Sequence, residues 1–329
     1  MANAHTFFRF TPRRNPKLVV FIVGGTALLI FVLFFAYFFA PLQMMFPVLR
    51  QKTPEDNLGG KPEVMFPTPA PYPVNASGIV PGGEVSAGGV IVLDVPSHMY
   101  LYKRNEDIKL SPASTTKLLT ALVALDAYKP DDVITIKTNG STGQVMGLVP
   151  GERITVENLL YGALIQSGND AALALASEYP GGYDKFIEAM NVKAKSLFMV
   201  NSNFTNPAGY DNPEHKVTPL DLAMLALAAI ENKTIAKMVA IPQITVSDVT
   251  HTYFHKLANV NQLVGKIPGV AGIKTGWTEQ AGENLMTYVE RDGRRVIFIV
   301  LHSRDRFGDT TKLISWVFDN FRWDTISPL

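Results

Sequence analysis

The feature that most constrains this sequence is a run of apolar residues near its N-terminus that contains no charge. The run covers residues 18–40, and as an α-helix it is about 35 Å long at 1.5 Å per residue. That length is enough to cross a hydrocarbon core of roughly 30 Å. A buried core helix rarely stays apolar on every face over such a distance. The run therefore predicts a transmembrane helix.

The charges before this run predict its orientation. Arg9, Arg13, Arg14 and Lys17 precede it, and the first 17 residues contain no Asp or Glu. Because basic residues are retained on the cytoplasmic side, residues 1–17 are expected to form a cytoplasmic tail, with the rest of the chain outside. A cleaved signal peptide is the competing interpretation. It requires a small residue where Phe38 stands, so an uncleaved, single-pass anchor is favoured.

Residues 41–83 are rich in proline. Because proline fixes φ and removes a backbone donor, this stretch is expected to be an extended, semi-rigid linker outside the membrane. Residues 84–329 are then expected to form one folded domain. The prolines of the linker are Pro41, Pro47, Pro54, Pro62, Pro67, Pro69, Pro71, Pro73 and Pro81.

Strand patterns stand at both ends of this domain and helical patterns in its middle. Asp292-Gly293 between two apolar runs is a strong hairpin signal. The order of elements predicts an α+β fold, in which an antiparallel sheet from the two ends of the domain packs against helices inserted between them. Strands are expected at residues 89–93, 99–102, 272–275, 285–290 and 295–301, and helices at 114–128, 156–164, 170–178, 183–197, 219–230 and 310–321.

Composition excludes several classes of function. The formal net charge is +1, which gives no support for a nucleic-acid partner. The chain has no cysteine. Disulfides, thiol nucleophiles and cysteine metal sites are therefore excluded.

The first motif that carries chemistry is Ser114-Thr115-Thr116-Lys117. Ser111 and Pro112 precede it, and they are expected to act as the N-cap and first residue of a helix. Ser114 and Lys117 are three residues apart and so lie on one helix face. This spacing suits a hydroxyl nucleophile beside an amine base, provided that burial or a nearby cation keeps the amine neutral.

Two further motifs follow along the chain. Ser167-Gly168-Asn169 stands just before an apolar helical run, and Lys274-Thr275-Gly276 stands on a predicted strand. Glycine at position 276 leaves room for a ligand along the strand edge, and Lys274 supplies positive charge. Each motif alone also has an ordinary structural interpretation: a helix with a serine near its start and a lysine for the first, a helix-capping turn for the second, and a strand that ends in a turn for the third.

Together and in this order, the three motifs are the set found in penicillin-binding proteins and serine β-lactamases. The domain resembles the low-molecular-mass penicillin-binding proteins that are D-alanyl-D-alanine carboxypeptidases. The resemblance covers residues 88–321 and implies a β-lactamase/transpeptidase-like fold, with an antiparallel sheet flanked by helices and an inserted all-helical subdomain. It extends to residues 112–118, 151–162, 206–209, 272–278 and 281–282.

The resemblance also implies a set of catalytic residues that act on peptidoglycan stem peptides. Ser114 would attack the carbonyl between two D-alanines and form an acyl-enzyme, while Lys117 takes its proton. Ser167 and Lys274 would relay a proton to the departing amine, and Asn169 would hold the peptide.

Substrate-binding residues are implied on the third motif and beyond it. Thr275, next to Gly276, would meet the terminal carboxylate, helped by the charge of Lys274. Backbone N–H groups of Ser114 and Trp277 would form an oxyanion hole, and Arg306 matches an arginine that contacts the carboxylate in some relatives. β-Lactam antibiotics would acylate Ser114, and a bacterial cell membrane would hold the protein with its catalytic domain outside the cytoplasm.

Several alternatives stay open at this point. A D,D-endopeptidase that acts on cross-links differs only in what the groove admits, and a β-lactam sensor needs no turnover. A serine β-lactamase needs a deacylating base, for which Glu188 is the candidate, although it falls within a helical pattern. No cofactor and no metal are expected, because His251 and His255 stand four apart without an acidic residue in the motif.

Overall fold

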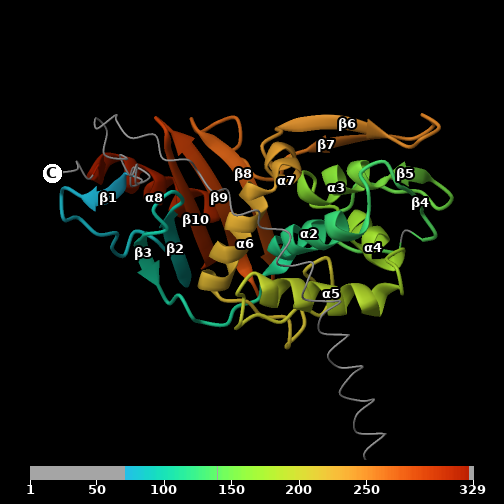
Figure 1. Ribbon diagram of the computed structural model, residues 1–329, viewed down its shortest axis with the longest axis horizontal. Coiled ribbons are helices and arrows are strands. Elements are labelled where there is room, and N and C mark those ends of the chain that lie inside the picture. The colour runs from blue at the N-terminus through green and yellow to red at the C-terminus, as the bar shows by residue number, and fades with distance from the viewer. Residues whose placement is uncertain (1–70, 139, 326–329) are drawn as a thin grey trace, which may run out of the picture. The chain divides into compact units, whose positions relative to one another are not determined.

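The computed structural model describes residues 71–138 and 140–325, and its centre is a five-stranded antiparallel sheet. The strands lie in the order β3-β2-β10-β9-β8, so both ends of the domain contribute to one sheet (Figure 1). β9 and β10 form a hairpin around Asp292-Gly293, as the sequence predicts. The bounds are β2 Gly89–Asp94, β3 Tyr100–Arg104, β8 Val270–Thr278, β9 Gly282–Arg291 and β10 Arg294–Ser303.

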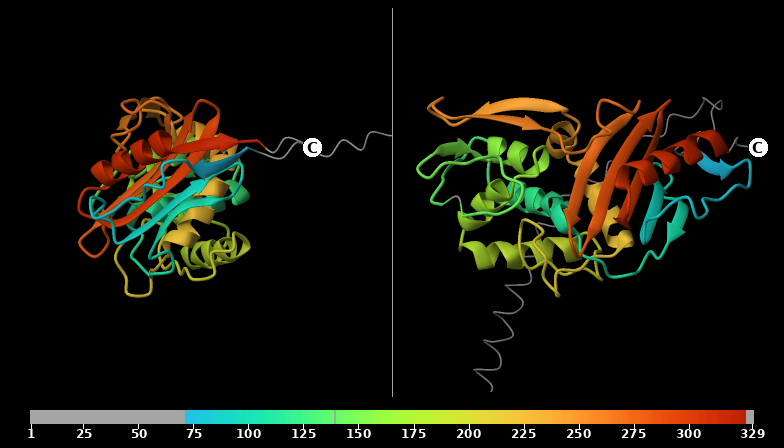
Figure 2. Two further views of the ribbon diagram at one scale, coloured as in Figure 1. Left: turned by 90° about the vertical axis from the view of Figure 1, so that its left-hand side faces the viewer. Right: turned by 180° about the vertical axis from the view of Figure 1, so that it is seen from behind.

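Alternating residues of the central strands pack on opposite faces of the sheet. Ile297 and Ile299 of β10 belong to the larger core, which they share with the helices, including α6 (Pro219–Glu231). Val296 and Phe298 belong to a second core, beneath α8 (Arg306–Asn320). Figure 2 shows the sheet between helices on its two sides. The period of two along a strand explains this division.

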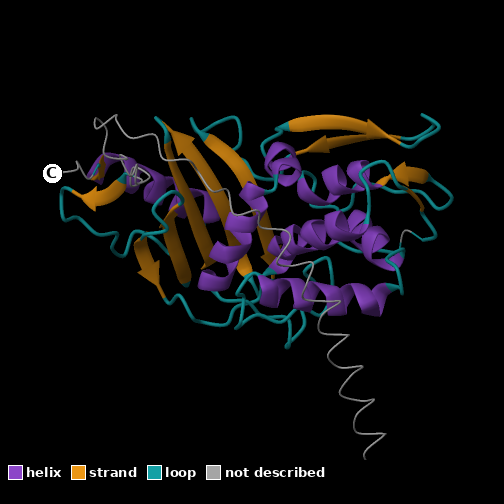
Figure 3. Ribbon diagram, viewed as in Figure 1, coloured by secondary structure: helices purple, strands orange, loops and turns teal. Residues whose placement is uncertain are grey.

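A helical half is inserted in the chain between β3 and β8. Figure 3 shows it beside the sheet as a group of packed helices. Thr155 and Thr218 cap two of these helices, because the side-chain oxygen of each accepts a hydrogen bond from the backbone N–H of the residue three positions later. The predicted α+β arrangement of an antiparallel sheet with inserted helices is confirmed. The remaining helices are α2 Lys117–Ala127, α3 Val156–Leu164, α4 Asn169–Ser177, α5 Tyr183–Ser196 and α7 Lys233–Val239.

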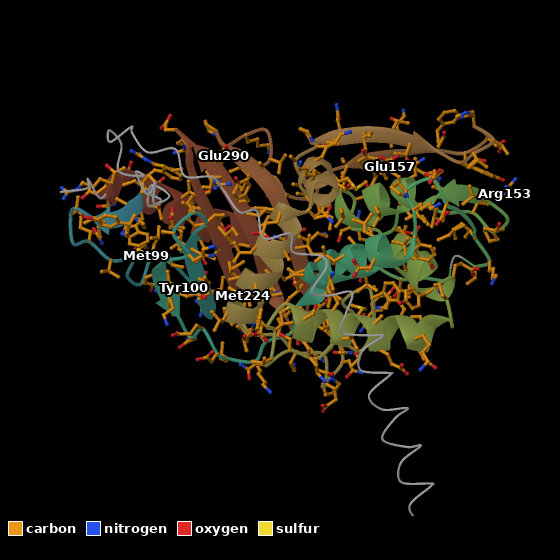
Figure 4. The ribbon with its side chains drawn as sticks, in the orientation of Figure 1. Met99, Tyr100, Arg153, Glu157, Met224 and Glu290 are labelled. Atoms are coloured by element: carbon orange, nitrogen blue, oxygen red, sulfur yellow. The ribbon has the colours of Figure 1, made fainter. Side chains whose placement is uncertain are left out.

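In the part of the chain that the structure describes, three small strand pairs lie outside the main sheet, and the sequence patterns did not predict them. β4 (Val133–Thr135) pairs with β5 (Arg153–Thr155) at the outer end of the helical half, where Figure 4 labels Arg153 and Glu157. β6 (Gln243–Ser247) pairs with β7 (Phe254–Ala258). Met224, which is also labelled, lies on α6 where that helix crosses the sheet.

The third small pair corrects the predicted linker boundary. β1 (Tyr72–Asn75) pairs antiparallel with β11 (Phe321–Asp324), so residues 72–75, which the prediction assigned to the linker, belong to the folded domain. Proline in the segment suggested a linker, but Pro73 lies in a two-stranded pair, whose outer edges tolerate a missing donor. Residues 41–70 of the predicted linker lie outside the described residues.

The predicted tail and transmembrane helix, residues 1–17 and 18–40, also lie outside the described residues. Within residues 71–138 and 140–325, no helix is both long enough and apolar enough to cross a bilayer.

Candidate active site

Ser114 lies in a short 3-10 turn, η1 (Ala113–Thr116), which runs directly into α2. The predicted cap by Ser111 is wrong: Pro112 is the residue before the turn, and no described side chain caps it. Ser111 Oγ instead accepts a hydrogen bond from Lys216 Nζ at 2.9 Å. Ala113 has φ 50°, which is uncommon for a residue with a Cβ. A constrained turn thus presents Ser114 at the start of the helix.

Lys117 points back at Ser114 from the first residue of α2. Its Nζ lies 2.8 Å from Ser114 Oγ, 2.7 Å from Asn169 Oδ1 and 2.6 Å from the carbonyl oxygen of Ala208. The side chain is fully buried. Lys117 therefore has three fixed oxygen neighbours, one of which is the candidate nucleophile.

The surroundings of Lys117 favour a neutral amine. Burial lowers the pKa of Lys117 well below its ordinary value, and the positive charge of Lys274 lowers it further, while the carboxylate of Asp170 acts in the opposite direction. A neutral amine beside a hydroxyl can accept the hydroxyl proton.

A second serine–lysine pair lies beside the first. Lys274 Nζ on β8 donates to Ser167 Oγ at 2.8 Å. Both residues are buried, and Ser167 has φ 62°. Burial, and next the charge of Arg306, lowers the pKa of Lys274 to about 7, so this amine can exchange a proton near neutral pH.

Asn169, the first residue of α4, joins the two halves of the site. Its Oδ1 accepts from Lys117, and its Nδ2 donates to the carbonyl oxygen of Thr142 at 2.6 Å. Asp170 holds the same loop by accepting backbone N–H groups from residues 146–148. Asn169 therefore connects the helix that follows Ser114 to the loop at residues 142–148, which none of the three sequence motifs includes.

A groove of about 560 Å³ contains the reactive groups. Gly276 lets β8 approach the nucleophile, because an added Cβ would lie 2.9 Å from the carbonyl oxygen of Pro112 and 3.1 Å from Ser114 N. Trp277 is 60% exposed beside it. The groove is lined by Ser114, Thr142, Gly143, Gln144, Ser167, Asn169, Ala208, Gly209, Tyr210, Val260, Thr275, Gly276, Trp277, Thr278, Glu279 and Arg306.

Arg306, the first residue of α8, supplies a cation in this groove. Its Nη1 donates to the carbonyl oxygen of Gly276 at 2.9 Å, and its Nε is buried without a hydrogen-bond partner among the described residues. The structure thus brings together residues that the sequence placed on three motifs, and Arg306, which lies outside them.

Comparison with known proteins identifies the family. Residues 75–305 match the family model described as D-alanyl-D-alanine carboxypeptidase, peptidase S11. The chain belongs to this family.

Individual proteins also resemble the chain over most of the described region. The carboxypeptidase DacF of Bacillus subtilis is 30% identical over 245 residues, 71% of this chain and 63% of DacF. DacC of Escherichia coli is 34% identical over 280 residues, 79% of this chain and 68% of DacC. The crystal structure of the Streptomyces K15 DD-transpeptidase is 31% identical with a TM-score of 0.69, and covers 73% of this chain and 100% of that one. The chain thus spans less than two thirds of DacF.

The loop at residues 206–210 is a part of this S11 site to which sequence reasoning assigned no role. Gly209 has φ 89°, and an added Cβ would overlap the carbonyl oxygen of Ala113. The only sign in the sequence that this loop matters is that residues 206–209 resemble the same stretch of the family. The loop contacts Lys117 through the backbone carbonyl of Ala208, and a contact made by a backbone group cannot be predicted from the residue type.

The two histidines considered as metal ligands do not form a site. His255 Nε2 lies 2.7 Å from Glu152 Oε1 in a buried pair, and His251 Nδ1 contacts Ser247 Oγ at 2.9 Å. Within the described residues, no three His, Asp or Glu side chains are placed to hold a metal ion.

Proposed function

We propose that the chain is a serine D,D-carboxypeptidase that removes the terminal D-alanine from peptidoglycan stem peptides. The observation that carries the proposal is the 2.8 Å contact between Ser114 Oγ and the buried amine of Lys117, inside an open groove. Membership of the S11 family and relatives named carboxypeptidase support it.

Acylation begins with proton transfer from Ser114 to neutral Lys117. Ser114 Oγ then forms a bond to the carbonyl carbon between the two D-alanines, and the carbonyl oxygen becomes an oxyanion. Backbone N–H groups of Ser114 and Trp277 are the proposed donors to that oxyanion. Such donors typically contribute roughly 10²–10³ in rate.

The second serine–lysine pair, Ser167 and Lys274, protonates the departing D-alanine amine. The C–N bond breaks as the departing amine takes a proton from Ser167, which regains one from Lys274 at 2.8 Å. The hydroxyl of Thr275 and the charges of Lys274 and Arg306 hold the terminal carboxylate of the substrate. A water molecule then attacks the ester carbonyl and passes a proton through Ser167 to neutral Lys274, while Ser114 Oγ takes back the proton held by Lys117. The shortened peptide leaves as a carboxylic acid, and Ser114 and both lysines return to their starting states.

The test uses the full chain in detergent with a Ser114→Ala control. We expect a fluorescent penicillin to label the protein covalently, and a peptide ending in D-Ala-D-Ala to release D-alanine. Both reactions must disappear in Ser114→Ala. An unlabelled wild-type protein would refute Ser114 as the nucleophile, and rapid turnover of the penicillin would indicate a β-lactamase.

A D,D-endopeptidase is the second candidate function. The D-alanyl-D-alanine endopeptidase of Escherichia coli is 32% identical over 243 residues, 71% of this chain and 78% of that protein. The two activities share the same acyl-enzyme chemistry and differ in the leaving group. Purified cross-linked peptide dimers, incubated beside the uncross-linked pentapeptide, separate them: dimer cleavage without release of D-alanine would favour the endopeptidase.

The β-lactamase alternative loses its candidate base. Glu188 lies on α5, 62% exposed in its side chain, and pairs with Lys185 at 2.6 Å. It does not line the groove that holds Ser114. A non-catalytic β-lactam sensor is an outcome of the test above, as labelling without release of D-alanine from either substrate.

We also propose that residues 18–40 anchor the protein in the bacterial cell membrane and that the domain works outside the cytoplasm. The uncharged run and the basic residues before it support this arrangement. Membrane fractionation with protease added outside intact spheroplasts tests it. Full-length protein that stays soluble after cell lysis, or is protected from the protease, would contradict it.

A further inference from the structure

His215 is a buried residue that does not line the groove yet contacts the elements that carry the nucleophile and the base. It lies between α5 and α6 and is 1% exposed. Its ring packs edge-on against Phe204, with centroids 5.4 Å apart. The two ring nitrogens face different parts of the site.

Nδ1 of His215 acts as an acceptor. The backbone N–H of Thr205 donates to it at 3.2 Å, and Asn206 Nδ2 lies 3.1 Å away. A backbone N–H can only donate, so the proton of the neutral ring is on Nε2, which lies 3.0 Å from Thr116 Oγ1. Burial, and next the charge of Lys216, lowers the pKa of His215 to about 4 and keeps the ring neutral.

Asn206 passes this contact on to the loop at residues 206–210. Its Oδ1 accepts the backbone N–H groups of Gly209 at 2.7 Å and Tyr210 at 2.9 Å, and its Nδ2 also donates to the carbonyl oxygen of Tyr210 at 3.1 Å. These bonds enclose Ala208 in a turn. The direction of the Ala208 carbonyl therefore depends on where the amide of Asn206 is held.

The Ala208 carbonyl matters because of what a neutral lysine needs. A neutral amine has two N–H groups and one lone pair, and only the lone pair can take a proton. When the Ala208 carbonyl and Asn169 Oδ1 accept the two N–H groups of Lys117, at 2.6 and 2.7 Å, the lone pair is left for Ser114. Without the Ala208 carbonyl, an N–H of the amine can turn toward the hydroxyl instead.

We propose that His215 is a positioning residue for the lysine base: it fixes Asn206 and the Ala208 carbonyl relative to Thr116, so that the lone pair of Lys117 faces Ser114. The inference rests on the proposed role of Lys117 as the base. It predicts a loss in the acylation step with little loss in non-covalent binding, since His215 does not line the groove.

The experiment measures the acylation rate constant and the non-covalent dissociation constant of a fluorescent penicillin separately, by stopped flow, on the full chain in detergent. The variants are His215→Leu, which removes both contacts, and His215→Asn, whose side-chain oxygen can replace Nδ1 as acceptor. Thr116→Val removes only the Nε2 partner and keeps the shape of the site. Phe298→Leu, in the second core, is the control for lost stability.

We expect the acylation rate constant of His215→Leu to fall at least about tenfold, with the dissociation constant within about threefold of wild type. His215→Asn recovers most of the loss, Thr116→Val loses a few-fold, and Phe298→Leu keeps the wild-type rate constant at the temperature of the assay. If His215→Leu does not fold, the split between rate and binding is determined on Thr116→Val.

Two results overturn the inference. One is that His215→Leu, or Thr116→Val in its place, acylates at the rate constant of Phe298→Leu. The other is that the rate constant is kept while penicillin binding weakens, which would make the network part of ligand binding. Both are distinct from failure of the proposed function, in which the wild-type protein itself is not acylated.

Discussion

Replacing Lys274 with methionine is expected to stabilise the fold while abolishing activity. Lys274 is 1% exposed, and its pKa is lowered from 10.5 to about 7 by burial and by the charge of Arg306. In the unfolded chain the same amine keeps its ordinary pKa. At pH 6 the folded protein therefore holds a charge where its surroundings disfavour it, and methionine occupies a similar volume without that charge.

The size of the gain depends on pH. One pKa unit corresponds to 1.36 kcal/mol, so a fall from 10.5 to about 7 costs the fold about 5 kcal/mol below pH 7. Between pH 7 and 10.5 the unfolded chain binds the proton and the folded chain does not, so the cost shrinks as pH rises. About 2 kcal/mol remains at pH 9. Methionine also leaves Ser167 Oγ without its donor, which costs about 1–3 kcal/mol.

The expected net gain in free energy of unfolding is thus about 2–4 kcal/mol at pH 6 and close to zero at pH 9. Urea unfolding at both pH values measures it, followed by the fluorescence of Trp277, Trp316 and Trp323. Lys237→Met, at an exposed position of α7, is the matched control and should show no such pH-dependent gain. An equal effect of Lys274→Met at both pH values, or a loss at pH 6, would refute the reasoning.

Three further predictions follow from contacts described above. Gly209→Ala should reduce penicillin acylation more than about 100-fold, because its Cβ overlaps the Ala113 carbonyl oxygen; normal labelling would show that the loop can move. The kcat/KM for a D-Ala-D-Ala peptide should fall as pH rises through about 7, where Lys274 loses its charge. Lys274→Arg should move this fall in kcat/KM to higher pH. If the fall stays at the same pH in a full pH profile, another group causes it. Asp309→Ala should lower the free energy of unfolding by about 2–3 kcal/mol, because buried Asp309 accepts from Ser86 and Ser303; a change in KM would contradict a purely structural role.

The elements that the sequence predicted well are those with a strong local signal. Short apolar runs marked the central strands, and Asp292-Gly293 marked the hairpin between β9 and β10. A separation of three residues places Ser114 and Lys117 on one face whether the first turn is 3-10 or α-helical. For this reason the error about the cap at Ser111 did not affect the position of the two groups.

The parts that the sequence did not predict depend on contacts between distant segments. β1 and β11 are about 250 residues apart in the chain, and proline in the first of them gives the same local signal in a linker and in a strand of a two-stranded pair. The Ala208 carbonyl that contacts Lys117 is a backbone group, so no residue type marks it. His215 and Thr116 meet across 99 residues, and only the fold shows that a buried histidine lies behind the base.

Pairing between β1 and β11 also bears on how the domain can be rearranged. Tyr72 and Asp324 are partners across this pair, so the two ends of the described domain lie about 5 Å apart, as in any antiparallel pair. Residues 72–324 thus form a nearly closed ring. Joining these ends with a few glycines and opening the chain at Asp292-Gly293 would give a circular permutant in which the order of Ser114, Ser167 and Lys274 is preserved. Because Tyr72 and Asp324 are neighbours, a reporter domain fused next to either residue would be attached at the same place on the domain surface.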